Sequence, residues 1–244
     1  MSRDTVVFLP GLLCDRAIWE RQIGVLSAHS ECVVPDYRDA DSLTAMAQTV
    51  LEAAPGRFSL AGHSMGGRVA LEVMRAAAQR VTRLALLDTG YRARPEGEGG
   101  EAEARRRARL LEIARSQGMR AMGREWLAGM VLPERLHEPS LIEPILAMIE
   151  RKTPDIFAAQ IRALLNRPSA DAVLDAIRCP TLILCGRQDG WSPLAQHEEM
   201  ARRVAGARLA IIEDSGHMVP LERPEQVTAA LTGWLGEAAA APRP

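Results

Sequence analysis

Short, continuously apolar segments alternate with amphipathic helical segments along most of this 244-residue chain. The apolar segments are rich in β-branched residues and lack a polar residue at every second position, as expected for strands buried on both faces of a parallel sheet. Strands that alternate with helices predict an α/β fold with right-handed crossovers. The six predicted strands are Thr5–Leu9, Cys32–Pro35, Phe58–Ala61, Leu84–Leu87, Thr181–Cys185 and Arg208–Ile212.

The alternation is interrupted once, because no strand is predicted between Tyr91 and Arg178. This interval instead contains several segments with helical periodicity, separated by prolines. We therefore predict a core formed by residues 1–90 and 179–236, a helical cap formed by residues 91–178, and a flexible tail at 237–244. The helices predicted in the cap are Ala102–Ser116, Met119–Met130, Leu141–Arg151 and Asp155–Asn166, and those in the core are Leu43–Ala54, Gly67–Ala78, His197–Val204 and Pro224–Leu235.

Composition narrows the function classes. The net charge of −1 gives no global field for nucleic acid, and no apolar run is long enough to span a bilayer. The four cysteines show neither CxxC spacing nor a matching histidine pattern, which argues against a metal site and favours reduced thiols. We expect a cytoplasmic monomer or homodimer that acts on a small molecule without a cofactor, a metal or membrane insertion.

One serine lies where such a fold can place a nucleophile. In the stretch FSLAGHSMGGRVALEVM, Ser64 stands between Gly62 and Gly66, after a predicted strand and before a helix. This G-x-S-x-G pattern suits a sharp strand-to-helix turn, in which side chains two residues to either side of the serine would collide. The alternatives are a turn that only packs a helix against a strand and a phosphate loop, but neither GxGxxG nor GxxxxGK[ST] is present.

A serine nucleophile requires a base, and the base requires a residue that orients it. His217, in EDSGHMVPLERPEQV, follows the last predicted strand, and Asp189, in CGRQDGWSP, follows the fifth. Both lie at carboxyl ends of strands, where sites form in open α/β sheets. Asp88, in LLDTG after the fourth strand, is a competing acid. We favour Asp189, because GxxD followed by a proline suits an acid loop.

Together, GHSMGG, GRQDGWSP and SGHMVPLERPEQ resemble the corresponding motifs of the α/β-hydrolase fold family, in its esterase- and lipase-like branch with a serine nucleophile and a helical cap. The resemblance implies Ser64 as nucleophile, His217 as general base and then acid, and Asp189 as its partner. It implies oxyanion donors at the backbone N–H groups of Leu12 and Met65, with Leu13 as an alternative to Leu12. Two departures from the family are expected: LPGLLCD stands where His-Gly is usual, and we expect a sheet without the β-hairpin that usually precedes the first strand.

The expected activity is that of a serine hydrolase of the carboxylic ester class, which cleaves an ester or thioester of a small, largely apolar acyl group through an acyl-enzyme. Carbon–carbon bond hydrolysis by the same triad and ligand reception without turnover are the alternatives. Leu13, Trp191, Trp126 and Met130 are the predicted pocket residues. We predict a cap lined mainly by Leu, Met and Ile. The further inward candidates are Leu146, Met148, Ile149 and Phe157, and we expect at least half of all the inward candidates, Trp126 and Met130 included, to form the cap's own core. For the arginines we predict a solvated surface, with a site for acidic substrates or partners as the minority alternative; they are Arg105, Arg106, Arg107 and Arg109.

Overall fold

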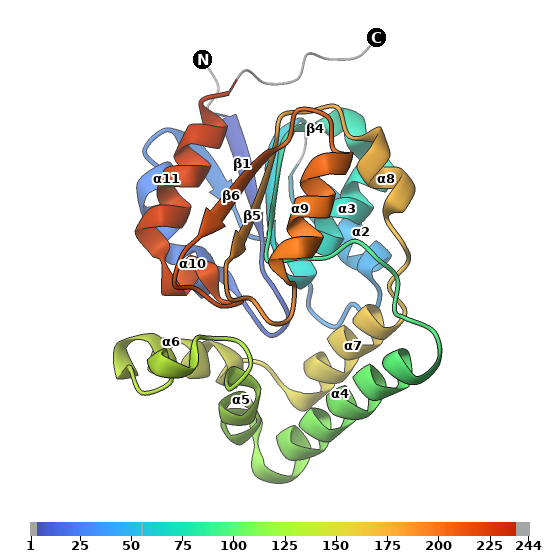
Figure 1. The fold of residues 1–244 in the computed structure, drawn as a ribbon, viewed down its shortest axis with the longest axis vertical. Helices are drawn as coiled ribbons and strands as arrows, with labels where there is room; N and C mark the ends of the chain where they lie inside the picture. Colours follow the sequence, from blue (N-terminus) through green and yellow to red (C-terminus); the bar gives the residue numbers. More distant parts are fainter. Residues whose placement is uncertain (1–3, 55, 238–244) are drawn as a thin grey trace.

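A computed structural model of the chain describes residues 4–54 and 56–237 and contains a sheet of six parallel strands (Figure 1). The order across the sheet is β2-β1-β3-β4-β5-β6, with β2 at one edge. The predicted α/β fold and the six-stranded parallel sheet are confirmed. The strands are β1 Asp4–Leu9, β2 Ser30–Val33, β3 Phe58–His63, β4 Val81–Leu87, β5 Thr181–Gly186 and β6 Arg208–Ile212.

The central strands are apolar throughout because both of their faces are covered. Every residue of β3 and of β5 is buried. The register pairs Leu9 with Gly62, His63 with Leu87, and Gly186 with Ile212, so the carboxyl ends of these strands meet at one end of the sheet. The loops that follow β3, β5 and β6 therefore open side by side, and these loops carry Ser64, Asp189 and His217.

Two groups of helices cover the sheet (Figure 1). Helices α1 (Glu20–Leu26) and α11 (Pro224–Leu235) pack together on one face, and α2, α3, α8 and α9 lie on the other. The sequence pattern did not predict α1, which is short and follows a 3-10 turn at Arg16–Trp19. The remaining core helices are α2 Leu43–Ala53, α3 Met65–Ala77, α8 Asp171–Ala176, α9 Leu194–Arg203 and α10 Val219–Glu222.

Between β4 and β5 the chain leaves the sheet, and α4–α7 lie beyond the carboxyl ends of the strands (Figure 1). Helix α8, inside the predicted cap range, packs against α3 and α9. The division into core and cap remains a prediction, and the predicted tail lies outside the described residues apart from Glu237. The helices at this end are α4 Gly97–Gln117, α5 Met119–Leu127, α6 Pro139–Glu150 and α7 Pro154–Leu165.

Candidate active site

Ser64 occupies a strained turn between β3 and α3. Its φ of 54° and ψ of −118° lie in a region that residues with a side chain rarely adopt. The neighbouring glycines make the turn possible: a Cβ on Gly62 would lie 2.4 Å from the carbonyl oxygen of Gly66, and one on Gly66 would lie 2.2 Å from that of Leu9. A hydrogen bond from the Ser64 N–H to the Leu87 carbonyl, 2.9 Å long, holds the turn against the end of β4.

A chain of two short hydrogen bonds joins the three predicted triad residues. The Ser64 hydroxyl lies 2.8 Å from His217 Nε2, and His217 Nδ1 lies 2.8 Å from Asp189 Oδ2. Because a carboxylate can only accept, Nδ1 carries the proton and Nε2 is free to accept from the serine. This is the arrangement that a general base needs in order to activate a hydroxyl.

The carboxylate of Asp189 is held from its other side. Its Oδ1 accepts hydrogen bonds from the backbone N–H groups of Trp191 at 2.8 Å and Ser192 at 2.9 Å. Burial by itself would raise the pKa of Asp189, but the charge of His217 and these hydrogen bonds lower it below the ordinary value. Asp189 is therefore ionised and fixed in orientation beside the imidazole.

The competing acid, Asp88, lies nearby but does not contact His217. It is fully buried, and its Oδ1 accepts from the Gly186 N–H at 2.9 Å. Burial, followed by the charge of Asp189, raises the pKa of Asp88 well above its ordinary value. His63, the residue before Ser64, supports the loop that carries His217: its Nε2 donates to the His217 carbonyl at 2.8 Å. Burial lowers the pKa of His63 to about 3, so this ring is a neutral support for the histidine loop.

The backbone N–H groups of Leu12 and Met65 remain the candidate oxyanion donors beside Ser64. The Leu13 N–H donates to Gln160 Oε1 at 2.8 Å, which leaves Leu12 as the available donor in the loop after β1. Met65 is the first residue of α3, so its N–H has no acceptor within the helix. Within the described residues neither the Leu12 nor the Met65 N–H makes a hydrogen bond, and both residues line the pocket above the serine.

Ser64 and His217 open into a cavity of about 170 Å³, which is smaller than the roughly 300–1,000 Å³ of sites for drug-sized ligands. Leu13 lies outside the pocket with a fully buried side chain, so its prediction as a pocket residue is corrected in favour of Leu12. The inward candidates Leu146, Met148, Ile149 and Phe157 are absent from its walls and fully or almost fully buried elsewhere, which agrees with the expectation that at least half of the candidates form the cap's own core. The predicted residues that do line the pocket are Leu12, Met65, Trp126, Met130 and Trp191.

The structure overturns the expected apolar lining and part of the predicted solvated surface. Arg107 is only 7% exposed and lines the pocket, and Arg106 lies over the Trp191 ring at 5.1 Å from its centroid. Arg105, Arg106 and Arg109 are exposed, as predicted, so only Arg107 departs from the predicted solvated surface. A sequence signal for Arg107 exists, since Arg107, Leu110 and Ala114 follow helical spacing on the buried face of α4. The charged pocket residues are Arg68, Glu103, Arg106, Arg107 and Arg167.

The segment after α5 holds the loop after β6 that carries His217. The sequence did not predict this contact. The Met130 carbonyl accepts from the N–H groups of His217 at 2.8 Å and Met218 at 3.1 Å. The buried carboxylate of Glu222 accepts from the Gly216 N–H at 2.9 Å and the Leu132 N–H at 3.2 Å. The position of His217 therefore depends on contacts between two segments that lie nearly 90 residues apart in the sequence.

A family model described as the alpha/beta hydrolase family matches residues 6–231, which is nearly the whole described chain. The chain belongs to the alpha/beta hydrolase family. As an alpha/beta hydrolase it is a hydrolytic enzyme, and its order of serine, acid and histidine along the chain is the order of this family.

Similar proteins include several hydrolases. A pimeloyl-[acyl-carrier protein] methyl ester esterase of Aromatoleum aromaticum is 30% identical over 193 residues, which cover 75% of this chain and 76% of that protein. A putative carbamate hydrolase of Rhizobium rhizogenes is 24% identical, with 91% of this chain and 88% of that protein covered. The solved structure of a thermophilic esterase from Thermogutta terrifontis with malate bound has a TM-score of 0.84 and 30% identity, and the match covers 96% of this alpha/beta hydrolase and 90% of that chain.

No group of three or more His, Cys, Asp or Glu side chains in 4–54 and 56–237 is placed to hold a metal ion. No helix in the same ranges has the length and apolar character needed to cross a bilayer.

Proposed function

We propose that this chain is a serine hydrolase that cleaves a carboxylic ester or thioester of a small acyl group through an acyl-enzyme. The observation that carries the proposal is the continuous hydrogen-bonded chain from Ser64 through His217 to Asp189, with 2.8 Å at each step, opening into a cavity. The esterases among the similar proteins support an ester as the scissile group.

In the acylation step, His217 Nε2 takes the Ser64 proton as the hydroxyl oxygen attacks the carbonyl carbon. Negative charge then develops on the carbonyl oxygen, which the N–H groups of Leu12 and Met65 stabilise together with the N-terminus of α3. Asp189 stabilises the imidazolium that forms. His217 next donates its proton to the leaving alcohol or thiol, and the ester oxygen of Ser64 remains bonded to the acyl carbon.

Deacylation repeats these roles with water. His217 takes a proton from a water molecule, the resulting hydroxide attacks the acyl carbon, and the Ser64 oxygen leaves and recovers its proton. We propose that α4–α7 act as the cap over this chemistry and set the size of the acyl group. The cytoplasmic location and the monomeric or homodimeric state remain predictions.

Burst kinetics with p-nitrophenyl acetate tests the proposal. A rapid release of nitrophenol equal to the enzyme concentration, followed by slower turnover, is expected because an activated ester acylates the serine faster than water removes the acyl group. The Ser64→Ala variant is expected to show neither phase. Absence of both phases in the wild type, together with unperturbed ligand binding, would favour the receptor alternative. Hydrolysis confined to vinylogous diketones would favour the carbon–carbon alternative.

A further inference from the structure

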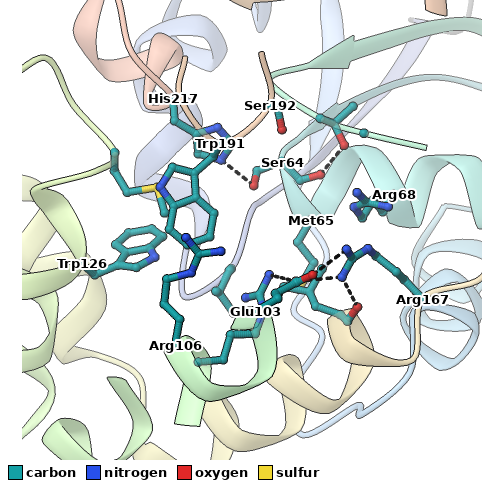
Figure 2. Close-up of a pocket in the computed structure, with 16 residues that line it drawn as sticks. Ser64, Met65, Arg68, Glu103, Arg106, Trp126, Arg167, Trp191, Ser192 and His217 are labelled. Carbon is teal, nitrogen blue, oxygen red and sulfur yellow. Dashed lines mark hydrogen bonds and ion pairs between the residues drawn. The ribbon is translucent and has the colours of Figure 1, made fainter. Parts of the chain in front are cut away.

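The pocket wall that faces Ser64 carries a surplus of positive charge. Its charged side chains are four arginines and one glutamate, although the whole chain has a net charge of −1. Figure 2 shows Glu103, Arg106 and Arg167 across the pocket from the Ser64 hydroxyl.

Both carboxylate oxygens of Glu103 already accept hydrogen bonds from arginines of the pocket wall. It forms a bidentate ion pair with Arg167, with two N–O distances of 2.8 Å, and it accepts from Arg107 at 2.8 Å and 3.0 Å. Arg68 and Arg106 form no ion pair with any carboxylate in the described part of the chain. Arg68 donates only to the Arg92 carbonyl, at 2.9 Å. The lining therefore contains guanidinium groups whose charge the protein leaves unbalanced.

This imbalance is unfavourable in an empty pocket. Burial, followed by the charge of Arg167, lowers the pKa of Arg68 to about 9. Arg68 is partly buried without a carboxylate partner, so an anionic ligand would offset its desolvation. Arg106 is exposed and contributes its charge at the mouth of the pocket. Guanidinium groups are planar forks that match the two oxygens of a carboxylate.

The unbalanced charges lie close to the reacting group. Arg68 lies in the first turn of α3, directly after the turn that carries Ser64, and both residues line the same pocket. Arg106 lies over the Trp191 ring, and the backbone N–H of Trp191 holds Asp189. A molecule with its carbonyl at Ser64 would thus reach these arginines with a chain of only a few atoms, as the small cavity requires.

We propose that the acyl group of the substrate ends in a carboxylate, which Arg68 and Arg106 bind inside the pocket. This inference rests on the proposed function and names its substrate class as monoesters of short dicarboxylic acids. Arg107 and Arg167, tied to Glu103, form the positive wall behind the bound carboxylate. The site discriminates against uncharged acyl groups of the same length because these leave the guanidinium groups unpaired.

A matched pair of esters tests this site. Monomethyl glutarate carries the carboxylate, and methyl 4-carbamoylbutanoate replaces it with a neutral amide of the same shape. We expect kcat/KM to be at least about tenfold higher for the anionic ester, and the ratio of the two values to fall by at least about tenfold in Arg68→Gln. Arg106→Gln, at the exposed mouth, provides a second variant if Arg68→Gln folds poorly. Arg105→Gln is the control, since Arg105 precedes Arg106 on α4 but is 65% exposed outside the pocket.

Calorimetric titration separates this proposal from the proposed function. The Ser64→Ala variant should bind monomethyl glutarate at least about tenfold more tightly than the amide. Tighter binding without turnover in the wild type would support the carboxylate site while contradicting the hydrolase. Turnover of both esters at equal kcat/KM, or equal binding of the two by the Ser64→Ala variant, would overturn the carboxylate site and leave the hydrolase standing.

Discussion

Replacing Asp189 with asparagine should invert the proton arrangement of His217. Oδ1 of Asp189 accepts from two backbone N–H groups, so in Asp189→Asn the amide oxygen is expected to keep that place. The amide NH₂ then faces His217 Nδ1, where it must donate. Nδ1 becomes the acceptor and the ring proton moves to Nε2, which can no longer accept the Ser64 proton.

The size of the effect distinguishes this tautomer effect from simple loss of charge. Loss of one hydrogen bond to a charged group is worth about 1.5–3 kcal/mol, or about a 10- to 150-fold change in rate. A wrong tautomer instead removes general-base catalysis, for which a loss of about 10⁴ in kcat is expected. The measurement is kcat for p-nitrophenyl acetate, with the melting temperature to establish that the variant is folded.

Asp88→Asn is the matched control. Asp88 is buried behind His63 and has a raised pKa, so the neutral amide closely resembles the protonated acid that it replaces. The kcat of Asp88→Asn should stay within about threefold of the wild-type value, which corresponds to a change in activation free energy of less than about 1 kcal/mol. The reasoning would be refuted if kcat fell by less than about 150-fold in Asp189→Asn. It would also be refuted if kcat fell by more than about threefold in Asp88→Asn.

Three further predictions concern the surroundings of the triad. Gly66→Ala should cost at least about 2 kcal/mol in the urea-unfolding free energy, because its Cβ would lie 2.2 Å from the Leu9 carbonyl oxygen, whereas Gly24→Ala, with open space around it, should be neutral or stabilising. Although burial opposes it, Arg167 and Arg107 lower the pKa of Glu103 from 4.5 to about 2. The stability that the Glu103 carboxylate provides is therefore present above about pH 4.5 and lost as the pH falls toward 2. Identical acid unfolding curves for the wild type and Glu103→Gln would contradict this pH dependence. Gln160→Ala should destabilise the protein by about 1–3 kcal/mol, since it leaves the buried Leu13 N–H without a partner, and an unchanged melting temperature would count against that bond.

Much of the fold follows from local sequence. The strands could be predicted because burial on both faces leaves a continuous apolar run, as at Phe58–His63 and Thr181–Gly186. The elbow could be predicted because its strain and its glycines lie within five residues, Gly62–Gly66. Helix α1 was missed because seven residues give too little periodicity to distinguish it from a turn.

The pocket depends on contacts that no local pattern encodes. Glu103 and Arg167 are 64 residues apart, and their pairing depends on how α4 lies against α7. A run of arginines on a polar helix is usually a solvated surface, and the spacing of Arg107 with Leu110 and Ala114 marks its face of α4 but not the partner that Arg107 meets there. The link from the Met130 carbonyl to His217 is a backbone contact, so no side-chain pattern could have revealed it.

The central claim is that the Ser64 oxygen becomes covalently bonded during the reaction. Incubation with a fluorophosphonate, followed by peptide mass spectrometry, tests this most directly. We expect one label per chain, on the peptide that contains Ser64, with the label lost in both Ser64→Ala and His217→Ala while both variants keep the wild-type melting temperature. Stoichiometric labelling of folded Ser64→Ala, or a label on another residue of the wild type, would contradict it.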